Sequence, residues 1–373
     1  MRRSLAALGV LIAMVAGALA DAPFIPNARA PDYVVAMETS SFGRKTESLR
    51  SHTHHGGWTR IDTVEKGRPA TRYFGHTDSV LVRLQRDSSG ALSYFDIRRG
   101  DDPSPIWSHD RFKTGETRTI LGETCQVWNV SRSTKTNFSL LSCVTDDGIE
   151  LWRAYMGDRG EISSATATRV ERRPVRPEDV RPPVEALSLK AWNELVDPAD
   201  AAPASAPGDF EAVIEPEPER LIPSARYTRI VRRHFPWILI DEQRVDGQRG
   251  LRVSNEVSGF SLRIGIHAKL GLHQLVMNKF APPAANKVNP VDLDRRETVL
   301  GETCRWFDIR PSVMDAGLHE CRTADGVVLK ALEISRGSRL PLAATRLTRR
   351  PVPLAQVLPP AEMVMPRSWN LPD

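Results

Sequence analysis

The sequence predicts a mainly β protein, built as two tandem homologous antiparallel-sheet domains with few short helices. Three observations lead to this fold class. Short apolar or β-branched runs are interrupted by Gly, Asp and Pro along most of the chain. One ordered set of landmarks occurs twice, and helix signals are sparse. Many short strands at such spacing are typical of antiparallel sheets.

The chain begins with the pattern of an export signal. Arg2 and Arg3 precede an uncharged apolar stretch, Leu5 to Ala20, which ends in a small-x-small cleavage pattern. We therefore expect a signal peptide at 1–20, cleavage near Ala20 and a periplasmic or secreted protein. No second apolar run reaches membrane length, so we expect no transmembrane segment in the mature chain.

The internal repeat defines the domain organisation. The sequence LGETC occurs at 121–125 and 300–304, and Trp-x-x-Ile-Asp occurs at 58–62 and 237–241. The spacing of these landmarks is the same in both copies, and Trp-Asn closes each copy at 192–193 and 369–370. A period this long indicates a duplicated domain. We place the copies at 31–195 and 209–373, joined by an Ala/Pro-rich linker at 196–208.

The expected strands follow the short apolar runs. In the first copy they lie at 33–38, 58–64, 69–75, 79–86, 91–98, 117–131, 137–145, 149–156 and 161–172. In the second copy they lie at 227–232, 237–244, 249–254, 260–267, 273–280, 297–310, 317–323, 327–334 and 342–349. Glu185 to Leu195 is consistent with one short helix. Its counterpart, Met363 to Trp369, contains Pro366, which argues against a shared regular helix.

The four cysteines are Cys125, Cys143, Cys304 and Cys321. An even number in an exported chain predicts disulfides, and equivalence of the copies selects the pairs Cys125–Cys143 and Cys304–Cys321. We expect each pair to lie directly opposite on adjacent strands. Alternation along the strand places the bridge on the more polar face, with Trp128 and Phe307 in the core.

Composition and motifs narrow the functional classes. The formal net charge is +5, with acidic residues interleaved among the arginines, which indicates a solvated mixed-charge surface rather than nucleic-acid binding. The standard motifs for hydrolases, zinc proteases, phosphate-binding loops and dinucleotide folds are missing. We therefore expect a protein that is not an enzyme, with no cofactor and no assigned metal site, although missing motifs do not exclude catalysis by residues that converge from distant positions.

The histidine run His52-x-His54-His55 is the strongest candidate for metal binding, because closely spaced imidazoles can bind a transition metal. Gly56-Gly57 follows directly and the run is polar, so we expect an exposed, mobile loop. Only one imidazole persists at the equivalent positions of the second copy. Whether the three histidines bind metal stays open.

Other candidates have a structural interpretation beside a functional one. Trp58 and Trp237 are expected to pack in the core. Asp62 and Asp241 are expected either at a ligand mouth or on exposed strands opposite an arginine. The acidic pairs at 101–102 and 146–147, and the Asp-Gly at 325–326, are expected to form turns.

The last half of each copy resembles the periplasmic LolA/LolB-like half-barrel class and related uncharacterised exported bacterial domains. The motifs that carry the resemblance are Gly-x-x-Cys, Cys-x-Thr-x-Asp-Gly and a closing Pro-Val with Pro-Pro, at 122–125, 143–148, 174–175 and 182–183. The chain departs from that class in its disulfides, scarce helices and duplication. The resemblance implies a curved antiparallel sheet whose concave apolar face holds acyl chains or a partner; it carries over no binding residues.

These observations lead us to expect an exported, non-enzymatic binding or scaffolding protein for an apolar ligand, a lipid, a lipoprotein or another envelope component. Two alternatives remain: a secreted hydrolase with a site between the copies, and a purely structural envelope protein. An apolar cavity would favour binding. Converging His and Asp residues with perturbed pKa values would favour the enzyme.

Overall fold

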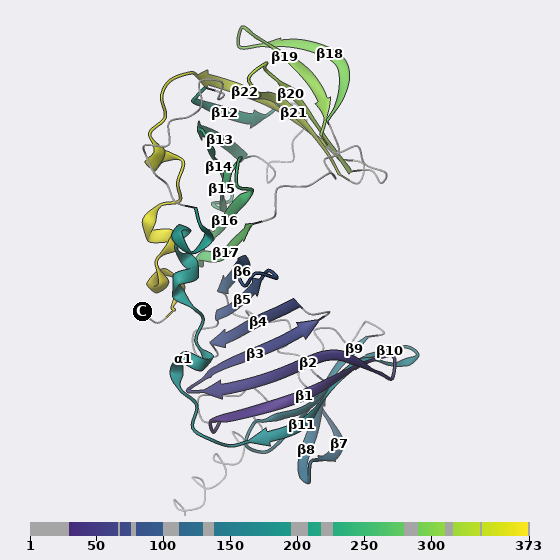
Figure 1. Ribbon diagram of the computed structural model, residues 1–373. Helices are drawn as coiled ribbons and strands as arrows, with labels where there is room; N and C mark the ends of the chain where they lie inside the picture. The colour runs from purple at the N-terminus through teal and green to yellow at the C-terminus, as the bar shows by residue number, and fades with distance from the viewer. Residues whose placement is uncertain are drawn as a thin grey trace, which may run out of the picture. The chain divides into compact units, whose positions relative to one another are not determined.

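The computed structural model of the chain describes residues 30–65, 68–75, 80–99, 112–129, 138–194, 208–217, 227–279, 290–309, 316–335 and 338–371 (Figure 1). The described residues form antiparallel strands with one α-helical turn and a few 3₁₀ helices, which confirms the mainly β fold class. The signal peptide at 1–20 and its cleavage site, the linker before residue 208 and the acidic pair at 101–102 lie outside the described residues. No helix in the described ranges is both long and apolar enough to cross a membrane.

The chain divides into two compact units. The first holds Met1–Gly67, Tyr73–Thr77 and Asp102–Arg181, and the second holds Arg68–Arg72, Asp78–Asp101 and Pro182–Asp373. The second unit therefore includes a hairpin and a closing segment that belong to the first copy of the sequence repeat. The copy boundaries at 31–195 and 209–373 remain a prediction about the sequence, and the folded units follow a different division.

The first unit contains one antiparallel sheet in the order β3-β2-β1-β11-β10-β9-β8-β7. Its strands are β1 (Tyr33–Ser41), β2 (Arg44–His55), β3 (Trp58–Glu65), β7 (Phe112–Ile120), β8 (Glu123–Asn129), β9 (Ser139–Val144), β10 (Glu150–Gly157) and β11 (Gly160–Glu171). Strand β4 (Arg68–Gly75) is divided between the units. The short helix α1 (Pro177–Val180) begins at a proline and packs against β2 and β3.

The second unit contains a longer antiparallel sheet in the order β5-β6-β17-β16-β15-β14-β13-β12-β22-β21-β20-β19-β18. Its strands are β5 (Val80–Arg86), β6 (Leu92–Arg99), β12 (Phe210–Pro216), β13 (Tyr227–His234), β14 (Trp237–Arg244), β15 (Arg249–Asn255), β16 (Phe260–His267), β17 (Gly271–Lys279), β18 (Val291–Val299), β19 (Glu302–Asp308), β20 (Ala316–Arg322), β21 (Val328–Ser335) and β22 (Ser338–Thr348). Strand β17 pairs with β6, the corresponding strand of the first sequence copy.

Two closing segments of 3₁₀ helix accompany this sheet. They consist of η2 (Val184–Leu187) and η3 (Leu189–Trp192), and of η6 (Leu354–Gln356), η7 (Ala361–Val364) and η8 (Pro366–Trp369). Each segment buries its tryptophan: the Trp192 indole donates to the Ala186 carbonyl, and the Trp369 indole donates to the Met363 carbonyl. Neither segment forms a regular helix: the short helix expected at Glu185 to Leu195 consists of two 3₁₀ turns, and Pro366 begins the 3₁₀ turn η8 of its counterpart.

The two predicted disulfides, Cys125–Cys143 and Cys304–Cys321, are present, with Cα separations of 5.3 and 5.2 Å. Their expected surroundings were wrong. All four cysteines are buried within the hydrophobic core clusters of the two units, whereas Trp128 and Phe307 are only partly buried. The cysteines of each pair are also offset along the ladder, since Cys143 lies opposite Val127 and not opposite Cys125. Because the strands twist, the distance between residues that are offset by two positions on adjacent strands is shortened in one direction, and the two cysteines can still form a bridge.

Two strands were missed by sequence reasoning, and two were merged with a neighbour. The end of β2, at residues 52–55, was expected to be a loop because it is polar and precedes Gly56-Gly57, and β12 carries Glu211 and Glu215 within a strand of only seven residues. The runs at 117–131 and 297–310 each hide a tight turn, at Leu121-Gly122 and Leu300-Gly301, where both residues have positive φ. A leucine is an unusual first residue for such a turn, so the pattern did not reveal it.

Candidate functional site

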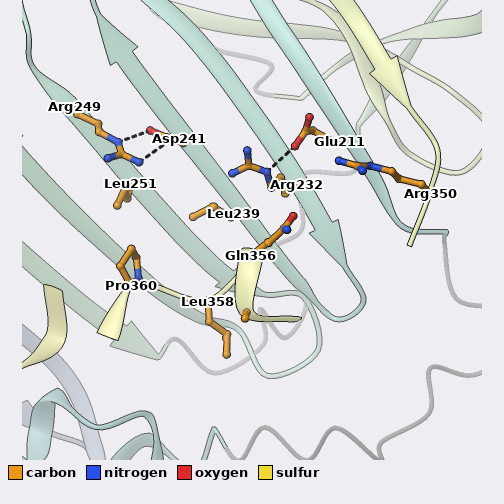
Figure 2. Close-up of a pocket in the computed structure, with 11 residues that line it drawn as sticks. Glu211, Arg232, Leu239, Asp241, Arg249, Leu251, Arg350, Gln356, Leu358 and Pro360 are labelled. Carbon is orange, nitrogen blue, oxygen red and sulfur yellow. Dashed lines mark hydrogen bonds and ion pairs between the residues drawn. The ribbon is translucent and has the colours of Figure 1, made fainter. Parts of the chain in front are cut away.

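A pocket of about 420 Å³ opens in the second unit where the closing segment after β22 passes over strands β12 to β15 (Figure 2). Four strands and the segment supply its lining: Glu211, Arg232, Leu239, Asp241, Arg249, Leu251, Arg350, Ala355, Gln356, Leu358 and Pro360. The side chains of one face of a strand alternate with those of the other, which brings Leu239 and Asp241 of β14 to the same side. The result is a cavity with an apolar centre and charged ends, of the size that binds small molecules.

One end of the pocket is closed by a two-pronged ion pair. Arg249 donates from Nε and Nη2 to the two carboxylate oxygens of Asp241, at 2.9 and 2.8 Å. The Asp241 side chain is only 4% exposed, while Arg249 remains partly open to solvent. These hydrogen bonds raise the pKa of Arg249. The pair is neutral as a whole, so this end of the pocket carries no excess charge.

The other end carries an excess of positive charge. Glu211 on β12 accepts from Arg232 at 2.7 Å and from Arg346 at 3.3 Å. Arg350 lies on the same side, with its guanidinium directed toward Glu211 in Figure 2. The hydrogen bond from Arg232, then the positive charges of Arg346 and Arg350, hold the pKa of Glu211 below its ordinary value. One carboxylate thus faces three guanidinium groups, and Leu239 lies between this end and the Asp241 end.

The corresponding place in the first unit is built differently. There Arg60 occupies the strand position of Leu239; its Nε lies 2.8 Å from an oxygen of Asp62, and its Nη1 donates to the Asp179 carbonyl in α1 at 3.3 Å. The repeated aspartate therefore has an arginine partner in both units, but that arginine comes from the same strand in the first and from β15 in the second. Since Leu239 is shorter and uncharged, the space that Arg60 crosses in one unit remains a pocket in the other.

The histidine run lies in a strand and not in a loop, which corrects the sequence expectation. His52 and His54 belong to β2 and are 3% and 0% exposed. The His54 ring stacks on Tyr33 at 5.2 Å, and His55 bonds to Asp32 at 2.9 Å. Alternation explains the burial, because His52 and His54 face the same side of the sheet as the core of the first unit. Within the described part of the chain, no group of three or more His, Cys, Asp or Glu side chains could hold a metal ion.

His52 joins a polar cluster with the buried Ser142, Glu150 and Arg153 and the partly buried Arg50. Glu150 accepts from Arg153 at 2.7 Å and from the Ser142 hydroxyl, and its second oxygen lies 3.8 Å from His52 Nδ1. Arg50 Nε donates to His52 Nε2 at 2.7 Å. Burial, and then the charges of Arg50 and Arg153, keep the pKa of His52 well below its ordinary value, so the imidazole is neutral at pH 7.

This cluster contains the residue types of a serine hydrolase in an arrangement that does not perform that chemistry. In a catalytic triad the histidine accepts the proton of the serine and is held by the acid. Here Ser142 donates to Glu150, and the accepting nitrogen of His52 is already occupied by Arg50. The histidine therefore has no free basic nitrogen for Ser142, and the geometry indicates a structural network.

The remaining candidates have structural roles. Trp58 and Trp237 are 6% and 3% exposed and pack in the core, as expected. Asp147 forms the expected turn, accepting from the Thr145 hydroxyl at 2.5 Å. Asp146 is exposed and does not share a site with it.

An ion-pair cluster at this turn was not foreseen. Arg172 bonds to both Asp147 and Glu123, at 2.8 and 2.6 Å, and Arg349 makes the same contacts with Asp325 and Glu302 in the second unit. The matching Arg, Glu and Asp positions in the two copies were the available signal.

No family model matches the chain, and no curated protein matches it. Among solved structures, MucB in complex with MucA(peri) is 14% identical, with a TM-score of 0.23, over 68% of this chain and 88% of that chain. The Pseudomonas aeruginosa MucA/MucB complex gives 14% identity and a TM-score of 0.25, over 68% and 90%. PNGF-II gives 10% identity and a TM-score of 0.31, over 70% and 69%. At these TM-scores the likeness carries no functional argument.

Proposed function

We propose that this is an exported, non-enzymatic binding protein whose second unit holds a small amphipathic anion, with an apolar body and one carboxylate, in the pocket of Figure 2. The observation that carries the proposal is the excess of guanidinium groups around Glu211 beside an apolar lining of Leu239, Leu251, Leu358 and Pro360. Disulfides in both units support export, because such bridges persist in oxidising compartments.

The charge distribution orients the ligand. Its carboxylate would lie against Arg350 and Arg232, where positive charge exceeds negative charge. Its apolar body would lie along Leu239 toward the neutral Asp241–Arg249 pair, which has no unpaired charge to repel it. Carboxylate recognition by arginine adds direction as well as energy, since the guanidinium donates two parallel hydrogen bonds.

The test is a calorimetric titration of the full mature chain with decanoate. We expect one site per chain, and a loss of affinity of about ten- to a hundredfold in Arg350→Gln, because a hydrogen bond to a charged group is worth about 1.5–3 kcal/mol. Arg173→Gln is the matched control: Arg173 is also exposed and pairs with Glu171 in the first unit. Equal affinity in the wild type and Arg350→Gln, or no binding to the wild type, contradicts the proposal.

The hydrolase alternative, with a site between the copies, stays a prediction; the cluster around Glu150 lends it no support, because Arg50 occupies a ring nitrogen of His52. A purely structural role predicts that decanoate does not bind, so the same titration separates it from the proposal.

A further inference from the structure

The roof of the pocket in Figure 2 has a counterpart in the first copy that makes the same turn. The roof segment, residues 353–358, corresponds to residues 176–181, since each follows directly on a repeated Arg-Pro-Val. Val357 and Val180 hold the same position in the two segments, and both are buried. The same two backbone hydrogen bonds close each turn, at 2.8 and 3.2 Å in the second copy and at 3.0 and 3.2 Å in the first. The two segments therefore differ mainly in their side chains.

The side chains of the roof segment carry no charge, in contrast to those of its counterpart. Four charged positions of the first copy hold uncharged residues in the second: Arg176, Glu178, Asp179 and Arg181 correspond to Pro353, Ala355, Gln356 and Leu358. Three of these uncharged residues line the pocket, namely Ala355, Gln356 and Leu358. Gln356 is the member of the segment whose side chain can form hydrogen bonds. The roof segment is therefore apolar except at one carboxamide.

Gln356 takes the place of Asp179 without the partners of that aspartate. The Asp179 carboxylate accepts from Arg176 at 3.0 and 2.9 Å, and its backbone carbonyl accepts from Arg60 at 3.3 Å. A proline and Leu239 stand at the two arginine positions in the second copy, and neither side chain can donate a hydrogen bond. Among the described residues, the Gln356 carboxamide has no hydrogen-bond partner. Figure 2 shows it directed from the roof toward the strands, between the arginine end of the pocket and Leu239.

We propose that the ligand of this pocket is an N-acyl amino acid, whose amide lies next to its carboxylate and is recognised by Gln356. The inference rests on the proposed function and names the class of its ligand. Guanidinium groups, the carboxamide and leucines follow one another along the pocket, and carboxylate, amide and acyl chain follow one another in the ligand. A carboxamide can donate to the ligand's carbonyl or accept from its N–H group.

The rest of the lining favours an acyl chain over a peptide. Beyond Gln356 the pocket offers leucines up to the Asp241–Arg249 pair, whose charged groups already bond to each other. A peptide carries an amide at every residue, and a buried amide without a partner weakens binding. A ligand with a single amide beside its carboxylate therefore matches the single carboxamide of the roof segment.

The experiment compares decanoate with N-heptanoylglycine in calorimetric titrations of the full mature chain. Both ligands have one carboxylate and the same number of chain atoms, and the second has an amide where the first has methylene groups. Gln356→Met removes the carboxamide and keeps an unbranched side chain of similar length. Gln248→Met is the matched control, because Gln248 is an exposed glutamine of the same unit that does not line the pocket.

We expect Gln356→Met to weaken binding of N-heptanoylglycine about tenfold and to change that of decanoate less than about twofold, because only the first ligand has an amide that loses its partner. Gln248→Met should bind both ligands as the wild type does. Both substitutions should leave the Tm unchanged, since the two side chains are exposed.

Three results would overturn the inference: no binding of N-heptanoylglycine to the wild type, equal binding of it to the wild type and Gln356→Met, or an equal loss of both ligands in Gln356→Met. Binding of decanoate alone overturns this inference and leaves the proposed function standing. Binding of neither ligand overturns both.

Discussion

The two units place different chemistry at matching strand positions. In the first unit, His52 lies opposite Val35 and Glu150 opposite Val144, and both take part in a buried polar cluster. In the second unit, the equivalent positions hold Val231, opposite Ala212, and Val328, next to the core cluster. The first unit thus stabilises its sheet with a satisfied polar network where the second uses apolar packing.

At another pair of matching positions, the first unit has the charged residue and the second unit has the apolar one. The first unit fills the place beside α1 with Arg60, whereas the second has Leu239 and leaves a pocket. The repeated aspartates Asp62 and Asp241 keep an arginine partner in both units. What the two copies share therefore builds the sheet and its turns. The proposed ligand site depends on a position at which the copies differ, Arg60 in the first and Leu239 in the second.

The largest expected effect on stability concerns the polar cluster. Glu150→Gln should lower the free energy of unfolding by about 3 kcal/mol, because it leaves Arg153 buried without its charge partner. Urea unfolding at pH 7 measures the change. The matched control, Glu161→Gln, alters an exposed carboxylate on the same sheet and should have little effect. A loss below about 1 kcal/mol would show that the network is not needed for stability.

Removing Arg172 or Arg349 should lower the free energy of unfolding by a smaller amount, and by the same amount in the two units. Hydrogen bonds from Arg172 hold the pKa of Glu123 below its ordinary value; they also outweigh burial at Asp147, whose pKa is likewise lowered. Arg349 does the same for Glu302 and Asp325.

Carboxyl groups with lowered pKa values stabilise the fold above their unfolded-state pKa, and this stabilisation is lost as the pH falls through the folded-state values. Arg172→Ala and Arg349→Ala should each cost about 1 kcal/mol at pH 7, since these pairs are partly exposed and screened. Thermal unfolding from pH 7 down to pH 3 should show the difference from the wild type shrinking as the solution becomes acidic. A difference that stays constant with pH would mean that the arginines act by packing alone.

Most of the architecture could be predicted from the sequence, because repeated apolar runs, turn residues and cysteine spacing report local structure. The disulfide pairs followed from equivalence of the copies. Burial of the cysteines and histidines did not follow, since polar or small residues on a strand do not reveal which face meets the core. Strand β2 was missed for the same reason.

The candidate site was only partly accessible to sequence reasoning. Asp241 was identified as a possible member of a ligand mouth, because it repeats Asp62. Its partner Arg249 and the charges around Glu211 come from separate strands and from the closing segment. Such convergence depends on register, and register is a property of the folded sheet. The informative difference is that the position of Arg60 in the first copy is occupied by Leu239 in the second. Its effect on the pocket can be recognised only when the two folded units are compared.

The central claim is that this exchange creates the ligand site, and decanoate titration of Leu239→Arg tests it most directly. The first unit's arginine at this position should fill the pocket and reduce affinity at least tenfold, although it adds a positive charge. Ala355→Phe, which fills the pocket from the exposed closing segment without touching the core, should have the same effect in a protein of unchanged stability. Unchanged or tighter decanoate binding in both variants would contradict the account.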